Sequence, residues 1–265
     1  YDAFILKFNN NGVRLWATYY GGSNNDIFTS VKSDLFGNIF IVGGTWSTDF
    51  PVYNPGGGTY FDGTCGTDGN CNWDNYSYKS DAVILKFNNN GQRLWATYYG
   101  GSSWEWECGT SGTSSGSAST YDYCSLTVDN NSNLIVVGMT ESGDFPTLNP
   151  GGGAYYQACH PGDFDAFILK FSNSGQLLWA TCYGGSSWDY ARSVDVDGSN
   201  NIFVVGFKVY SSDFPTYNPG GGAYYQTCSG SNWDAFILKF NSSGVRLWAT
   251  CYGGSNHEWA DGVVV

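Results

Sequence analysis

Short apolar runs separated by turn residues make up most of this chain, and they recur in one order. In the first unit they are Phe4 to Phe8, Leu15 to Tyr20, Thr29 to Asp34 and Asn38 to Gly43. Asn and Gly residues join the first two runs, and Asp, Gly and Asn join the last two, as in β-hairpin turns. The pattern favours short strands over helices and predicts two hairpins per unit.

A repeated heptapeptide marks the outer hairpin of each unit. Asp-Ala-Phe-Ile-Leu-Lys-Phe begins at Asp2, Asp81, Asp165 and Asp234, with Val83 replacing Phe in the second copy. Each copy is followed at constant offsets by a Gly and then by a Trp. A fixed period indicates supersecondary units that bury their faces against neighbouring units.

The repeated motifs together resemble a known family. Asp-Ala-Phe, the Gly turn, Trp-x-Thr-x-x-Gly-Gly, the Asp/Asn hairpin before a Val-rich strand, and Asp-Phe-Pro at Asp49, Asp144 and Asp213 are similar to the SBBP-type β-propeller repeats of bacterial and archaeal secreted and surface proteins. The resemblance implies an all-β fold, a β-propeller-like array of four-stranded antiparallel blades. It implies a scaffold and no particular reaction.

In that register the chain is a single array, with three complete units and partial units at both ends. The second blade carries an insertion at about 103–124 that a disulfide closes. Neither terminal unit is complete, so we expect the leftover halves to pair with another element. The expected parts are an outer hairpin (1–28), three blades (29–99, 100–183 and 184–252) and the first strand of a next blade (253–265).

Eight cysteines indicate an oxidising compartment, and therefore an extracellular or cell-surface protein. Two pairs with the same spacing join the Tyr-containing loop of a unit to its Trp-Ala-Thr-Cys strand, and the other two pairs close the insertions. The predicted bridges are Cys159–Cys182, Cys228–Cys251, Cys65–Cys71 and Cys108–Cys124.

The charge pattern excludes some classes of partner. The net charge is −12 with 11 Lys and Arg residues, most of which recur at repeat positions and form no patch. We therefore expect no nucleic-acid binding, and no apolar run is long enough to span a membrane.

The recurring carboxylates are interpreted as structural, because a catalytic site normally breaks repeat symmetry whereas these occur in every copy. No nucleophile motif is present, so we expect no enzyme activity and no cofactor. Asp195, Asp197 and Asn201 resemble an oxygen-rich calcium loop, and a turn is preferred over that alternative.

Several aromatic residues break the repeat and are open to two interpretations, packing between blades or contact with a partner. Three Asn residues lie in glycosylation acceptor patterns, at Asn75, Asn130 and Asn241. The aromatic candidates are Trp104, Trp106, Trp188, Trp259, Trp73 and Tyr76.

Two functions from different classes follow. The first is a non-enzymatic extracellular structural protein that assembles with copies of itself in a surface filament, sheath or layer through its incomplete ends. The second is a carbohydrate-binding or adhesion module that uses the extra aromatic residues. The predicted edge residues are Tyr1, Phe4, Leu6, Val263, Val264 and Val265.

Overall fold

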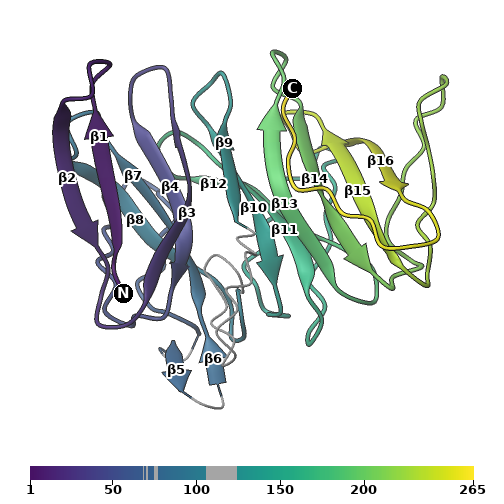
Figure 1. The fold of residues 1–265 in the computed structure, drawn as a ribbon, viewed down its shortest axis with the longest axis horizontal. Helices are drawn as coiled ribbons and strands as arrows, with labels where there is room; N and C mark the ends of the chain where they lie inside the picture. The colour runs from purple at the N-terminus through teal and green to yellow at the C-terminus, as the bar shows by residue number, and fades with distance from the viewer. Residues whose placement is uncertain (68, 70, 75–76, 106–123) are drawn as a thin grey trace.

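The structure is a computed structural model that describes residues 1–67, 69, 71–74, 77–105 and 124–265 (Figure 1). The described residues form β-strands and no helix, and no helix long and apolar enough to cross a membrane is found among them. The strands are β1 (Ala3–Phe8), β2 (Arg14–Tyr20), β3 (Asp26–Ser33), β4 (Ile39–Thr45), β5 (Asn72–Asp74), β6 (Ser77–Lys79), β7 (Asp81–Phe87), β8 (Arg93–Tyr99), β9 (Ser125–Val128), β10 (Leu134–Thr140), β11 (Asp165–Phe171), β12 (Leu177–Tyr183), β13 (Asp189–Val196), β14 (Ile202–Val209), β15 (Trp233–Phe240) and β16 (Arg246–Tyr252).

Three antiparallel sheets of four strands contain most of these elements. Their orders are β3-β4-β7-β8, β9-β10-β11-β12 and β13-β14-β15-β16. Each sheet joins an inner hairpin to the Asp-Ala-Phe hairpin that follows it, so the predicted all-β, four-stranded blades are confirmed. The hairpin β1–β2 pairs only with itself, and β5–β6 is a small separate hairpin.

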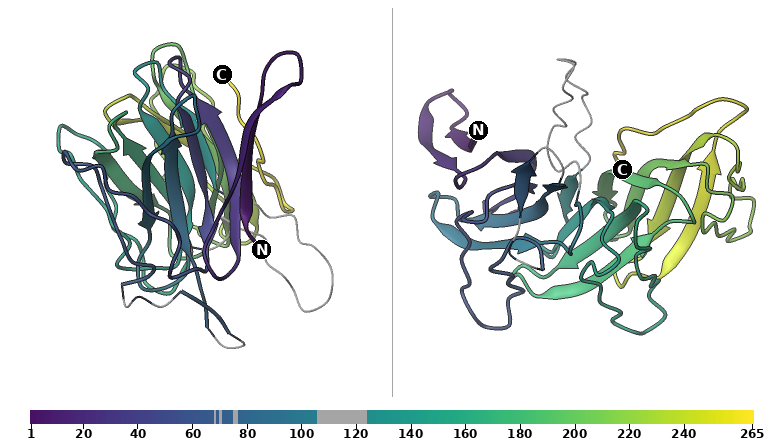
Figure 2. Two further views of the ribbon diagram at one scale, coloured as in Figure 1. Left: turned by 90° about the vertical axis from the view of Figure 1, so that its left-hand side faces the viewer. Right: turned by 90° about the horizontal axis from the view of Figure 1, so that it is seen from below.

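The three sheets stand side by side, with β1–β2 beyond the first and β16 at the far end (Figure 1). Seen from below, they fan out in an arc (Figure 2). The first strand of the middle sheet, β9, lies against both β3 and β13, so the first strands of successive blades are neighbours.

The second strand of a blade contains a glycine that the first strand requires. The β3–β4 register shifts between Phe28 and Ser30, which brings the Ile27 carbonyl against Gly43. Gly206 meets the Tyr190 carbonyl in the same way, so a Cβ at either glycine would overlap a backbone carbonyl. The close approach explains the Gly in otherwise β-branched runs.

The Gly and Trp of the repeated motif meet across each boundary between blades. A Cβ on Gly244 would lie 2.9 Å from the Trp179 ring, and Gly244 has φ +81°. This glycine therefore serves the turn and leaves room for the indole of the preceding blade. The equivalent pairs are Trp16 with Gly91 and Trp95 with Gly175.

The apolar core lies between successive sheets. Phe40 and Ile84 of the first sheet pack with Phe167 and Leu169 of the second. Both faces of the middle sheet are covered, and every residue of β10 and β11 is buried.

Candidate functional site

The N-terminal hairpin β1–β2 occupies the place of an outer hairpin, and no inner hairpin pairs with it among the described residues. The Asp26 amide donates to the Tyr1 carbonyl at 2.8 Å, just as the Asp189 amide donates to the Phe164 carbonyl at 2.6 Å. The same bond joins Glu105 to Ser80 at 3.1 Å and Glu258 to Trp233 at 3.0 Å. The hairpin is thus docked on the first blade in the regular way, and the described residues supply two strands of its sheet.

The apolar side chains of β1 are exposed, in contrast to their counterparts in the complete sheets. Phe4 is 62% exposed and Leu6 is 47% exposed, whereas their counterparts Phe167 and Leu169 are fully buried. In the complete sheets a second strand covers this edge, pairing Gly138 with Phe167, for example. β1 therefore presents an unpaired, apolar edge.

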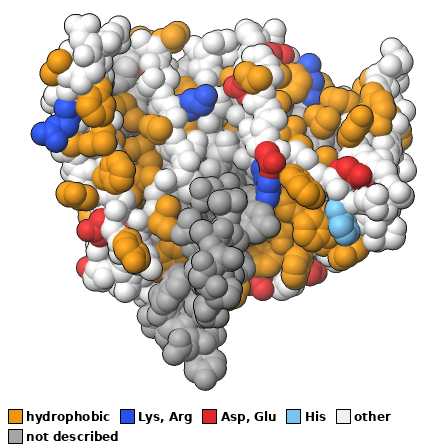
Figure 3. All heavy atoms as spheres, viewed as in Figure 1, with side chains coloured by type: hydrophobic (Ala, Val, Ile, Leu, Met, Phe, Trp, Pro, Cys, Tyr) orange, Lys and Arg blue, Asp and Glu red, His pale blue; other side chains and the backbone are white. Residues whose placement is uncertain are grey.

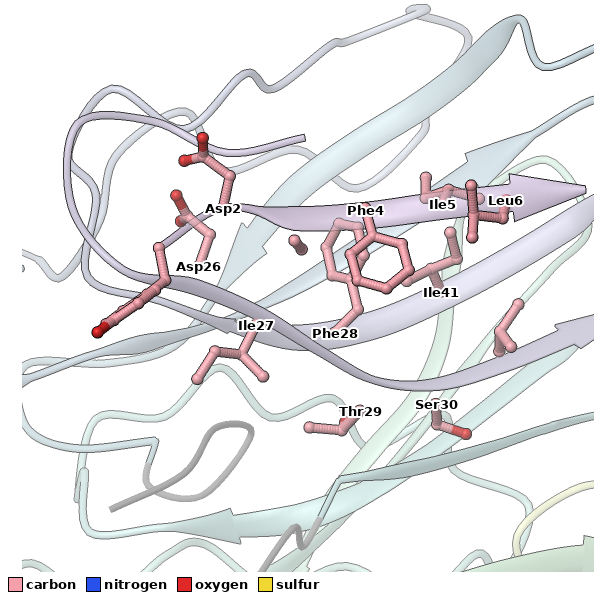
Figure 4. Close-up of a pocket in the computed structure, with 13 residues that line it drawn as sticks. Asp2, Phe4, Ile5, Leu6, Asp26, Ile27, Phe28, Thr29, Ser30 and Ile41 are labelled. Carbon is pink, nitrogen blue, oxygen red and sulfur yellow. The ribbon is translucent and has the colours of Figure 1, made fainter. Parts of the chain in front are cut away.

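A groove of about 490 Å³ runs between β1 and β3. Phe4, Ile5 and Leu6 line one side, and Phe28 of β3 and Ile41 of β4 lie opposite (Figure 4). Since β3 lies beside β9 on its other side, the groove is where the first and second strands of a preceding blade would lie. Orange apolar atoms are exposed over this end of the molecule (Figure 3).

The C-terminal segment is not the strand that the sequence predicted for 253–265. No strand ladder forms there, and no described strand pairs with the segment. Even so, the Val263 amide donates to Ser193 Oγ at 3.2 Å, and the Leu126 amide donates to Ser30 Oγ at 3.4 Å. Ser30 and Ser193 are repeat equivalents, so the segment lies on β13 as β9 lies on β3.

Two further contacts hold this segment against β13. The Val265 amide donates to Asp195 Oδ2 at 3.0 Å, and Arg192 forms an ion pair with Asp261. The other oxygen of Asp195 accepts from Thr127 of β9 at 3.3 Å. Val263 to Val265 therefore occupy the first-strand position of a further blade.

The two ends correspond to different parts of one blade. The N-terminal hairpin supplies the third and fourth positions, and the C-terminal segment supplies the first. The second position, held by β4, β10 and β14 in the complete sheets, is filled at neither end by described residues. Direct pairing of Val263–Val265 with β1, the simplest form of the predicted complementation, would skip that position.

Three of the four predicted cysteine pairs are joined in the structure. Cys65–Cys71 has a Cα–Cα distance of 5.5 Å, and Cys159–Cys182 and Cys228–Cys251 each have 5.2 Å. The Cys108–Cys124 prediction lies outside the described residues, because Cys108 is not among them. No described cysteine is free.

The repeated Asp-Phe-Pro carboxylates bind backbone and hydroxyl groups of a neighbouring turn. Asp49 Oδ1 accepts from the Ser23 amide at 2.7 Å and its hydroxyl at 2.9 Å. Asp213 accepts from Ser186 in the same way, at 2.9 and 3.0 Å. The hydrogen bonds from Ser23 and from Ser186 hold the pKa values of Asp49 and Asp213 below their ordinary range. These acids are fixed as charged turn anchors, as their recurrence suggested.

The residues of the calcium-like loop do not converge on one point. Asp197 Oδ1 accepts from the Ser199 and Asn201 amides, and its Oδ2 accepts from Asn201 Nδ2 at 2.8 Å. Asp195 instead contacts Thr127 and Val265. The geometry is that of a β-hairpin turn, the alternative preferred from the sequence.

The aromatic candidates are divided between core and surface. Trp104 is half-buried against a cluster that includes Phe207, while Trp188 and Trp259 are 46% and 55% exposed. Trp106 and Tyr76 lie outside the described residues, as does the side chain of Trp73. Packing therefore accounts for Trp104, and partner contact stays a prediction for Trp188 and Trp259.

Of the glycosylation candidates, Asn130 and Asn241 lie in hairpin turns. Asn130 Nδ2 donates to the Gly198 carbonyl at 3.2 Å, and Asn241 Oδ1 accepts from the Ser243 amide at 3.0 Å. Asn75 lies outside the described residues.

The fold and the two ends define an array of β-propeller blades. A family model described as "SBBP: Beta-propeller repeat" matches residues 15–51, which span β2 to the Asp-Phe-Pro loop. The chain therefore carries the SBBP-type repeat that its motifs indicated. It is also 24% identical over 173 residues to an uncharacterized WD repeat-containing protein of Acanthamoeba polyphaga mimivirus. That similarity covers 64% of this chain and only 12% of the viral protein.

Proposed function

We propose that this protein is a non-enzymatic extracellular structural protein whose copies assemble end to end in a surface filament, sheath or layer. The observation that carries the proposal is the complementarity of its ends, a half-blade with a bare apolar edge at β1–β2 and a first-strand segment at Val263–Val265. In a docked pair, the two ends supply three of the four strand positions of one blade.

Burial of apolar surface in the groove provides the driving force. A docked first strand would cover part of the exposed surface of Phe4 and Leu6, and each Å² of apolar surface that is buried contributes roughly 25 cal/mol. Natural proteins usually protect sheet edges with charge, proline or a covering loop. Only Lys7 is charged in β1, and its ammonium is directed to Asn89 of the next blade.

The two ends are different surfaces, so the contact between copies is heterologous. A heterologous contact that does not close into a ring propagates as a fibre. The array is already an arc of radiating sheets (Figure 2). We expect a copy that docks at one end to extend the array at that end.

The remaining features support an extracellular scaffold. Disulfides join loops to strands in two blades, and they persist in oxidising compartments. The Asp-Phe-Pro carboxylates accept hydrogen bonds from backbone amides, which supports a structural role for them at each turn.

Negative-stain electron microscopy of the purified protein tests the proposal, together with the variant Leu6→Lys. A charged group in the groove should abolish extended particles. Leu35→Lys is the matched control, because Leu35 is 88% exposed in the β3–β4 turn, away from the groove. Compact single particles of the wild-type protein at high concentration would contradict the proposal, as would equal assembly of the two variants.

A further inference from the structure

A pair of acids recurs at each junction between successive blades. The Asp that begins an outer hairpin faces an acid at the start of the next blade, across the first Gly of the Gly-Gly turn. A Cβ on Gly100 would lie 2.5 Å from Glu105 Oε2 and 2.6 Å from Asp81 Oδ1, so these oxygens face each other across that Cα. The pairs are Asp2 with Asp26, Asp81 with Glu105, Asp165 with Asp189, and Asp234 with Glu258.

Two of these junctions contain a nitrogen group beside their acids. Lys208 Nζ lies 2.9 Å from Asp234 Oδ2, and both side chains are fully buried. At the preceding junction, His160 Nδ1 lies 3.2 Å from Asp165 Oδ2. Each of these two acid pairs therefore has a nitrogen partner among the described residues.

The Asp81–Glu105 junction differs. No ion pair between described residues involves either acid. Asp81 is 1% exposed and Glu105 is fully buried. Asp81 Oδ2 accepts from the Gly66 amide and Glu105 Oε1 accepts from Thr140, both within 2.9 Å. The Ser142 hydroxyl and the Gly101 amide also lie close enough to Glu105 to lower its pKa, but this effect is smaller than that of burial. Asp81 Oδ1 and Glu105 Oε2 accept no hydrogen bond with regular geometry.

The other titratable groups around this pair add no compensation. Asp62 in the loop after β4 and Asp144 in the loop after β10 are both acids, and both disfavour a charge on Asp81. The phenols of Tyr60 and Tyr98 are neutral, with pKa values raised mainly by burial. Two ionised carboxylates in this place would be buried, unpaired and mutually repulsive.

We infer that Asp81 and Glu105 hold one proton between them, taken up from solvent, and that this proton compensates the buried acids as the Lys208 ammonium compensates Asp234. The first and second blades are thereby joined by a pH-sensitive contact. Burial, the largest cause, raises the pKa of Asp81 to about 7 and also raises that of Glu105, to which the charge of Asp81 contributes.

The sign of the pH dependence follows from linkage. Both carboxyl groups ionise near their ordinary pKa values of about 4 in the unfolded chain. The folded pair retains its proton to a higher pH, so its stabilising contribution is complete below about pH 4 and is lost as pH rises toward about 7. Over that window the contribution of the pair raises the unfolding equilibrium constant about tenfold for each pH unit.

Denaturant unfolding at pH 5, 6 and 7 tests the inference with Glu105→Gln and Thr45→Lys. The amide of Glu105→Gln supplies a permanent donor and removes one titrating proton. The unfolding equilibrium constant of this variant should therefore rise less steeply with pH than that of the wild type, by up to tenfold per pH unit. The buried acids of the other junctions, such as Asp189, contribute equally in both proteins. Thr45 is the cross-strand partner of Asp81 as Lys208 is of Asp234, so Thr45→Lys should also flatten the profile. Parallel profiles of the wild type and Glu105→Gln would overturn the inference.

A second experiment uses the wild-type protein alone and therefore does not depend on whether a variant folds. Carbon NMR of the carboxyl groups should show one member of the pair titrating well above the ordinary range. Ionisation of both near pH 4 would overturn the inference. A pH profile that added calcium abolishes and a chelator restores would also overturn it, because the pair would then hold a metal ion.

Discussion

Lys208 of β14 and Asp234 of β15 form a fully buried ion pair across adjacent strands, with Nζ and Oδ2 2.9 Å apart. The ammonium also donates to the Asn232 carbonyl at 2.9 Å and to the Ser229 carbonyl. Thr45 and Thr140 hold the corresponding positions in the other complete sheets. The third blade therefore replaces a hydroxyl with a charge that an acid neutralises.

Removing the positive charge of Lys208 should lower the stability of the protein. Lys208→Met leaves Asp234 buried without its cation, and breaking a buried ion pair in this way destabilises a protein by about 3–5 kcal/mol. The double variant Lys208→Met/Asp234→Leu should recover most of the loss, because neither charge remains. Denaturant unfolding measures both variants, and a single variant as stable as the wild type would contradict this account of the junction.

Gly184 should not tolerate a side chain. Its Cα lies between the carboxylates of Asp165 and Asp189, and an added Cβ would overlap both. Gly184→Ala should therefore destabilise the protein by about 1–3 kcal/mol, as overpacking does. The control is Gly198→Ala, because no heavy atom lies within 4 Å of a Cβ there. Equal melting temperatures of the two variants would show that the acid pair has more room than the structure gives it.

The disulfides of the second and third blades should contribute comparable stability. Each closes a loop with a sequence separation of 23 residues, for which loss of the bridge costs on the order of 3 kcal/mol. Cys228→Ser/Cys251→Ser and Cys159→Ser/Cys182→Ser should show similar losses in thermal unfolding. A negligible loss in either would mean that the loop is held by its other contacts, such as Tyr217 with Ala249 in the third blade.

Much of the fold could be predicted because one local pattern recurs. The turn glycine after each Asp-Ala-Phe strand, such as Gly244, is a sequence signal for a positive φ. Its second role, stacking against Trp179 of the preceding blade, is a contact between units and has no local signal. The sequence gives one indirect indication of this contact, because the Gly and the Trp both recur at constant offsets.

The state of the C-terminal segment could not be predicted from its residues. Val263 to Val265 have high strand propensity, yet a strand is defined by a partner, and no described residue pairs with them. The partners of the junction acids were also missed, since Lys208 and His160 break the repeat in positions that only the fold brings beside an Asp.

Assembly by complementary ends is tested most directly by mixing two variants that are each blocked at one end. Leu6→Lys blocks the groove and leaves the C-terminal segment intact, whereas Val264→Lys, at a residue that is 87% exposed, blocks the segment and leaves the groove intact. In sedimentation velocity, each variant alone should be a monomer of 28.8 kDa, and an equimolar mixture should form a dimer that grows no further. A mixture that stays monomeric while the wild type assembles would contradict the account, and so would either variant assembling alone.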